Sequence, residues 1–134
     1  MMSRIKRFAR PVPTLTAAAL AAALLPGSVA QAAEQVSFAL DVRPILESRC
    51  VSCHQPGSAG YEESGLDLTS YEGLMAGTRH GPIVVPGDPV TSNLNVLIEG
   101  RAAPELLMPH DERPLLRHQQ LIIRDWVRQG ARPN

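Results

Sequence analysis

The only two cysteines of the 134-residue chain stand in the sequence Cys50-Val51-Ser52-Cys53-His54. In a C-x-x-C-H sequence the two thiols can add to the vinyl groups of a haem and become thioethers, and the adjacent imidazole can bind the iron as its proximal ligand. Two attachment points at this spacing fix one edge of the porphyrin, so the short histidine side chain reaches the metal from one side. The motif therefore predicts one covalently bound haem c, held by Cys50, Cys53 and His54.

Three other uses of the cysteine pair stay open. A redox dithiol of the thioredoxin type stands in a βαβ context, whereas loop-forming residues follow this motif. A structural zinc site needs four ligands, and the chain has neither a second C-x-x-C nor an H-x-x-x-H. The further candidates for such a site are His54, His80, His110 and His118. A disulfide across two intervening residues would close a loop too small to add much stability.

The second axial ligand of the iron would decide the chemistry. Met108 stands in the proline-rich segment 107–110, where Pro109 restricts the neighbouring backbone. A thioether ligand favours reduced iron and raises the reduction potential, as an electron carrier requires. The alternatives are a core-packing role for Met108, ligation by Met75, and a second histidine ligand, His110 or His80.

Residues 1–32 have the composition of a secretory signal peptide. The first ten residues carry four basic and no acidic side chains, an apolar run of 11 residues spans 15–25, and Ala30-Gln31-Ala32 offers a cleavage site. The apolar run is shorter than the roughly 20 residues that a transmembrane helix needs. We therefore expect Sec-type export to the periplasm and a mature domain at 33–134 with no membrane span.

The expected mature domain is acidic and poor in aromatic side chains. Residues 33–134 carry 13 acidic residues, nine arginines and no lysine, which gives a formal charge of −4. No basic patch indicates nucleic-acid binding, and an acidic surface disfavours anionic membranes. The four aromatic residues of this part are Phe38, Tyr61, Tyr71 and Trp126. We expect a haem to complete so thin a core and to be needed for folding.

Hydrophobic spacing and capping residues predict an all-α fold of about four helices, with long loops wrapped around the haem. The expected helices are 37–49, 70–75, 92–99 and 116–129. Asp41 is expected to cap the first of them and Ser70 or Thr69 the second, and Gly77 and Gly130 are expected to end the second and the last. The last helix has an apolar stripe that includes Trp126 and a solvent face that includes Arg124. The segments expected to be irregular are 55–65, 79–89 and 102–114.

The order of these motifs resembles the Planctomycete-type cytochrome c domain, a branch of the class I-like monohaem cytochromes. The resemblance covers 38–132, and its segments are 41–46, 50–54, 65–68, 81–89, 92, 108–109, 126–127 and 129–131. It implies a small cytochrome c-like fold in which Cys50 and Cys53 carry the haem, His54 is proximal and Met108 is distal. It also implies that the first and last helices cross and that Trp126 packs near the haem. One departure is His110, which stands where the family often has a second proline, so His110 is the alternative distal ligand.

These features predict an exported c-type cytochrome that transfers single electrons to and from redox proteins of the periplasm. We do not expect an enzyme, because both axial positions would be filled and no catalytic triad, acid–base pair or phosphate loop accompanies the haem. The alternative is a haem-containing subunit of a periplasmic oxidoreductase complex, or a small-ligand sensor, with a labile or open sixth position. Arg79 and Arg101 are interpreted either as contacts of the haem propionates or as solvated side chains. The sequence indicates no oligomeric state.

Overall fold

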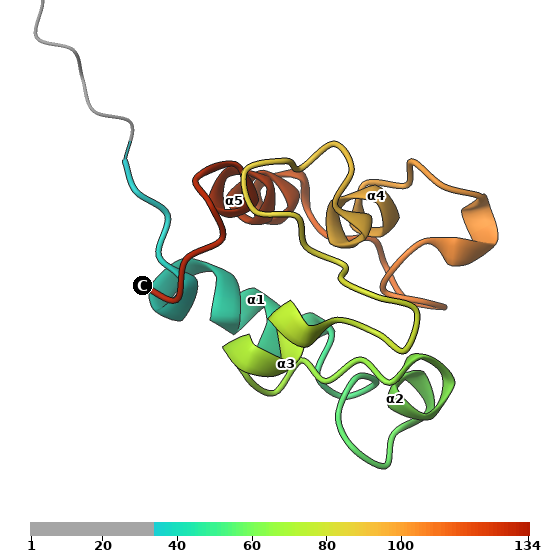
Figure 1. Ribbon diagram of the computed structural model, residues 1–134. Helices are drawn as coiled ribbons and strands as arrows, with labels where there is room; N and C mark the ends of the chain where they lie inside the picture. Colours follow the sequence, from blue (N-terminus) through green and yellow to red (C-terminus); the bar gives the residue numbers. More distant parts are fainter. Residues whose placement is uncertain (1–33) are drawn as a thin grey trace, which may run out of the picture. The chain divides into compact units, whose positions relative to one another are not determined.

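The computed structural model describes residues 34–134, which form helices joined by long irregular segments (Figure 1). The elements are η1 (Phe38–Val42), α1 (Arg43–Arg49), α2 (Ala59–Ser64), α3 (Tyr71–Ala76), α4 (Asn93–Ile98), η2 (Pro104–Leu106) and α5 (Arg117–Arg128). The described residues contain no β-strand, only one isolated bridge between Thr78 and Gly81. The predicted all-α class is therefore confirmed. The predicted signal peptide lies outside the described residues.

The first predicted helix is present as two consecutive segments, the π-helical η1 and then α1. Ser37 caps it, because its Oγ accepts the N–H of Leu40 at 3.2 Å. Asp41 was expected in this place, but it lies inside the first turn and its Oδ2 accepts the N–H of Ser37 at 2.7 Å. Each of the two side chains thus accepts a backbone N–H at the start of the helix, as in a capping box. The prediction that Asp41 is the capping residue was therefore wrong: Ser37 is the cap, and Asp41 binds the backbone N–H of Ser37.

The first and last helices cross through an aromatic cluster, as the resemblance implies. The ring centroid of Phe38 in η1 lies 5.4 Å from that of Trp126 in α5 and 5.2 Å from that of Tyr71 in α3. Trp126 is 1% exposed, and its Nε1–H donates to the carbonyl of Arg132 at 2.9 Å. The chain end is tied to the same place, since Asn134 Oδ1 accepts the N–H of Phe38 at 2.9 Å. This junction joins the two ends of the described chain and fixes the direction in which α1 leaves it.

The segment 55–65, expected to be a loop, contains the helix α2. None of the side chains of α2 is buried, so the segment lacks the apolar periodicity from which a helix is predicted. Other parts of the chain hold it: the guanidinium of Arg79 donates to the carbonyls of Glu62 at 2.6 Å and Glu63 at 3.0 Å. These carbonyls belong to the last turn, where a helix leaves its acceptors without partners. Arg79 thus caps α2, a role that neither of its two sequence interpretations included.

The ends of α3 and α5 agree with the sequence predictions. Ser70 Oγ accepts the N–H of Gly73 at 3.0 Å and so caps α3, which ends at Gly77. Gly77 has a φ of +79°, and a Cβ there would lie 2.5 Å from the carbonyl oxygen of Gly81, so only glycine fits this turn. The last helix ends just before Gly130, whose φ is +99°.

A buried carboxylate joins α4 to α5. Glu99, directly after α4, has a side chain that is 5% exposed. It accepts from Arg124 Nη1 at 2.9 and 3.0 Å and from Arg101 Nε at 2.8 Å. Arg101 also donates to the carbonyls of Pro89 and Val90, at 2.9 and 2.8 Å. The prediction that Arg124 faces water holds only in part: its side chain is 33% exposed, but its guanidinium binds a carboxylate that the contact between α4 and α5 encloses.

Candidate functional site

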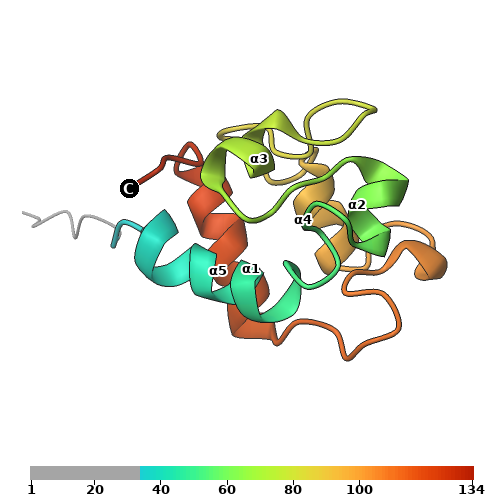
Figure 2. The same ribbon diagram turned by 90° about the horizontal axis from the view of Figure 1, so that it is seen from below.

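A cavity of about 550 Å³ brings the predicted site residues together. Its lining includes Cys50, Cys53 and His54, from the end of α1 and the turn after it, and also Met108 and His110. Figure 2 shows the backbone of the elements that supply much of this lining, namely α1, α2, α4 and the segment after η2. The volume lies within the range of about 300–1,000 Å³ that is usual for ligand and cofactor sites.

The walls of this cavity are apolar, and its rim is charged. The leucine and isoleucine side chains of the lining are Leu66, Leu68, Ile83, Leu94, Leu97 and Ile98. All of these except Leu97 are buried members of the hydrophobic core, so the cavity is a recess in the core itself. The charged side chains of the lining are Arg49, Glu63, Glu105, Asp111 and Glu112. Apolar walls suit a large apolar ring and limit the access of water to a bound metal.

Backbone hydrogen bonds continue α1 into a tight turn that presents the motif. The N–H of Cys50 donates to the carbonyl of Leu46 at 2.8 Å, and the N–H of His54 donates to the carbonyl of Cys50 at 3.0 Å. The carbonyl of His54 in turn accepts the N–H of Leu68 at 2.8 Å. The turn is therefore fixed at both ends by the core, and its two thiols and its imidazole line the same cavity.

Burial keeps two groups of the motif neutral. Burial raises the pKa of the Cys50 thiol to about 11 and lowers the pKa of the His54 imidazole below its usual value. A neutral imidazole has a lone pair free for a metal. A reactive dithiol has a lowered thiol pKa, so the raised value at Cys50 argues against the thioredoxin-like alternative. Within residues 34–134, no three side chains of His, Cys, Asp or Glu are grouped closely enough to hold a metal ion, as a zinc site would require.

The two methionines proposed as distal ligands lie in different places. Met108 lines the cavity, is half-buried against the core, and its N–H donates to the carbonyl of Leu97 in α4 at 3.3 Å. Met75 packs against the core from α3 and is not part of the cavity lining. The geometry thus favours Met108 over Met75 as a ligand in this cavity.

The two alternative histidines also differ. His110 lines the cavity, but its side chain is 60% exposed and its Nε2 lies 3.6 Å from a carboxylate oxygen of Asp111. His80 is exposed and does not line the cavity. His110 therefore remains the one alternative to Met108 that the cavity brings close.

The imidazole of His54 lies directly on the backbone of α2. A Cβ at Gly60 would lie 2.9 Å from His54 Cε1, 3.1 Å from its Nδ1 and 2.6 Å from the carbonyl oxygen of Cys53. His54 Nδ1 is buried and has no hydrogen-bond partner among the described residues. Because this side of the ring is closed, Nε2 is the nitrogen left for a ligand in the cavity. Two thiols, a neutral imidazole with one available nitrogen, a thioether and apolar walls together fit a haem. Sequence analysis missed Gly60 because a single glycine in a segment rich in Gly and Ser gives no distinct signal.

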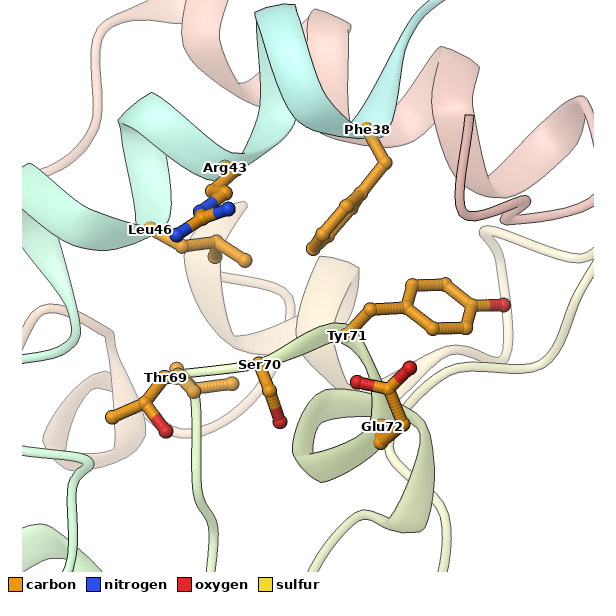
Figure 3. Close-up of a pocket in the computed structure, with 8 residues that line it drawn as sticks. Phe38, Arg43, Leu46, Thr69, Ser70, Tyr71 and Glu72 are labelled. Carbon is orange, nitrogen blue, oxygen red and sulfur yellow. The ribbon is translucent and has the colours of Figure 1, made fainter.

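A second cavity, of about 300 Å³, lies on the other side of Leu68, which lines both. Figure 3 shows Phe38 and Tyr71 on one part of its wall and Arg43 on another. Its lining contains no cysteine, histidine or methionine. Trp126, which the resemblance places near the haem, lines neither cavity and packs in the aromatic cluster.

Comparison with known proteins agrees with this site. Residues 50–112 match the family model described as Planctomycete cytochrome C, a segment that begins at the first cysteine of the motif and includes Met108. No curated protein and no solved structure matches the chain. None of the helices between residues 34 and 134 has the length and apolar content that crossing a membrane requires. The resemblance inferred from the sequence is thus confirmed over residues 50–112, which match a Planctomycete-type cytochrome c domain, a type that implies haem c and haem-based electron transfer.

Proposed function

We propose that this chain is an exported c-type cytochrome that carries single electrons through one haem c. Cys50 and Cys53 would hold the haem covalently, and His54 and Met108 would be its axial ligands. The observation that most supports this is the shared lining of one apolar cavity by the two thiols, the imidazole and the thioether. A haem bound there would cycle between ferric and ferrous iron and so take up and release one electron.

The residues around the cavity have separate roles in this proposal. His54 supplies a neutral nitrogen because burial lowers its pKa. Met108 supplies a soft sulfur that favours the reduced state. The leucine and isoleucine walls keep the polarity low, which disfavours the more highly charged ferric state and so adds to the effect of the thioether.

Optical spectra of the wild type, Met108→Ala and the matched variant His110→Ala test this proposal. We expect c-type haem bands in all three proteins, and haem that survives acid–acetone extraction. The weak far-red band of methionine-ligated ferric iron should be present in the wild type, remain in His110→Ala and vanish in Met108→Ala. A wild type without haem would contradict the proposal and favour the interpretation of the cysteines as a dithiol or a zinc site. A wild type that carries haem but lacks the band would instead point to His110 or to an open sixth position.

A labile sixth position is the second candidate, as in a small-ligand sensor or a haem-containing subunit of an oxidoreductase complex. It is favoured by the weak support of Met108, whose backbone bond to Leu97 is 3.3 Å long and which lies in an irregular segment. Carbon monoxide distinguishes the two functions. Native reduced protein that binds the gas readily would support the labile ligand, whereas binding that requires Met108→Ala would support the electron carrier.

Export to the periplasm and redox proteins as partners are part of the same proposal, and they rest on the predicted signal peptide at 1–32. N-terminal sequencing of the protein released from the periplasm tests this part. A mature N-terminus near residue 33 would support export. A full-length chain that stays with the cytoplasmic fraction would contradict export, while the haem proposal would still be decided by the spectra.

A further inference from the structure

We propose that Gly60 is a positioning residue for the proximal histidine. The missing side chain lets the imidazole of His54 lie against α2, with Nδ1 closed off from any hydrogen-bond acceptor. The consequence for the haem rests on the proposed function, whereas the packing of the ring against α2 does not.

Gly60 is required by close approach and not by backbone conformation. Its φ is not in the left-handed region, and it lies in the first turn of α2, where alanine would normally stabilise a helix relative to glycine. A Cβ there would be 2.6 Å from the carbonyl oxygen of Cys53 and 2.9 Å from Cε1 of His54. The first neighbour is backbone and the second belongs to a rigid ring beside it, so any residue larger than glycine must displace the ring or the turn.

The turn cannot easily move away from α2, because several hydrogen bonds hold the two together. The carbonyl of Cys53 accepts the N–H of Tyr61 at 3.1 Å and the hydroxyl of Ser58 at 2.5 Å. At the other end of α2, Arg79 binds the carbonyls of the last turn. With both ends of α2 fixed, a side chain at Gly60 would press both on the Cys53 carbonyl and on the imidazole of the next residue.

The closed-off nitrogen has an electronic consequence. A metal-bound histidine usually donates its second N–H to a carbonyl or carboxylate, and this bond raises the basicity of the ligand. His54 Nδ1 has no such partner in the described part of the chain, and the nearby carbonyl of Cys53 already accepts two donors. His54 is therefore a weakly basic ligand that stabilises ferric iron less and keeps the reduction potential high.

The experiment compares wild type with Gly60→Ala and with Glu62→Ala, an exposed position of the same helix that does not line the cavity. We expect Gly60→Ala to keep covalent haem but to shift the midpoint potential downward, because a displaced ring admits water to Nδ1. Glu62→Ala should have the wild-type potential. A folded, haem-loaded Gly60→Ala protein with an unchanged potential would overturn the proposal.

A second measurement decides the packing even if Gly60→Ala does not fold. In the wild-type ferrous protein we expect a nuclear Overhauser effect between an α-proton of Gly60 and Hε1 of His54, and slow solvent exchange of Nδ1–H. Absence of the Overhauser effect, or fast exchange, would refute the inference. If the wild type carries no haem and still melts cooperatively, the proposed function fails, but the same Overhauser effect in that folded chain still supports or refutes the packing of His54 on α2.

Discussion

Replacing Glu99 by glutamine should destabilise the protein far more than the same replacement at Glu47. The carboxylate of Glu99 is 5% exposed and accepts three hydrogen bonds from Arg101 and Arg124. Glu47 also pairs with an arginine, Arg43, at 2.7 Å, but these two side chains are 53% and 58% exposed. The two substitutions are chemically identical, so a difference between them measures burial.

The expected cost follows from the exposure of the partners. Removing one member of a fully buried ion pair costs about 3–5 kcal/mol. Both arginines that bind Glu99 are about one-third exposed and can regain part of their hydration, and a glutamine oxygen can still accept one bond. We therefore expect a loss of about 2–3 kcal/mol for Glu99→Gln, against about 0.3–0.5 kcal/mol for Glu47→Gln. In a domain of this size the first value corresponds to a drop of about 10–20 °C in Tm.

Urea and thermal unfolding of the haem-loaded proteins, followed by far-ultraviolet circular dichroism, give both numbers. Glu99 ends α4, whose Leu97 carbonyl accepts the N–H of Met108. Glu99→Gln should therefore also weaken the far-red band, whereas Glu47→Gln should not. If the two variants lost the same stability, to within about 0.5 kcal/mol, Glu99 would be hydrated in solution and the reasoning from its burial would be refuted.

Three further predictions concern the elements that support the site. Trp126→Ala should cost about 3–5 kcal/mol in urea unfolding, because it removes a buried ring and its bond to the carbonyl of Arg132; a loss below about 1 kcal/mol would contradict this packing. Arg79→Ala should speed amide exchange in the last turn of α2 and leave α5 unchanged; equal protection in both proteins would show that the cap is not needed. The double variant Cys50→Ala/Cys53→Ala should lack covalent haem and a native-like cooperative melt, and a haem-free protein that still melted cooperatively would contradict the dependence of the fold on haem.

The sequence predicted the features that depend on neighbouring residues. The C-x-x-C-H motif is local, and its two thiols and histidine do line one cavity. Ser70, Gly77 and Gly130 also act within one turn of their own helices, where capping and left-handed backbone follow from residue type alone. Met108 was selected for its proline-flanked segment, and the cavity brings it to the same place as the motif.

The features that escaped prediction depend on contacts between distant parts of the chain. The helix α2 has no buried face, and Arg79, from a later segment, binds its last turn. From the sequence, Glu99 is an acidic residue after an apolar helix and would be expected in solvent, but in the fold Arg124 of α5 covers it. Gly60 matters because of the ring that packs on it. The spacing of residues along the chain does not reveal such contacts, because tertiary packing sets them and local propensity does not.

The two halves of the core should respond differently to the loss of haem. Leu68, Leu94 and Ile98 are buried core residues that also form cavity wall, so part of their apolar surface would be covered by the cofactor and not by other side chains. Phe38 and Trp126 pack on each other and are not part of the lining of this cavity. Binding of a group to the folded state alone adds its binding free energy to the stability of that state. A haem bound in the cavity would therefore stabilise the cavity half of the domain directly, whereas the aromatic junction between the first and last helices would depend on it only through the rest of the fold.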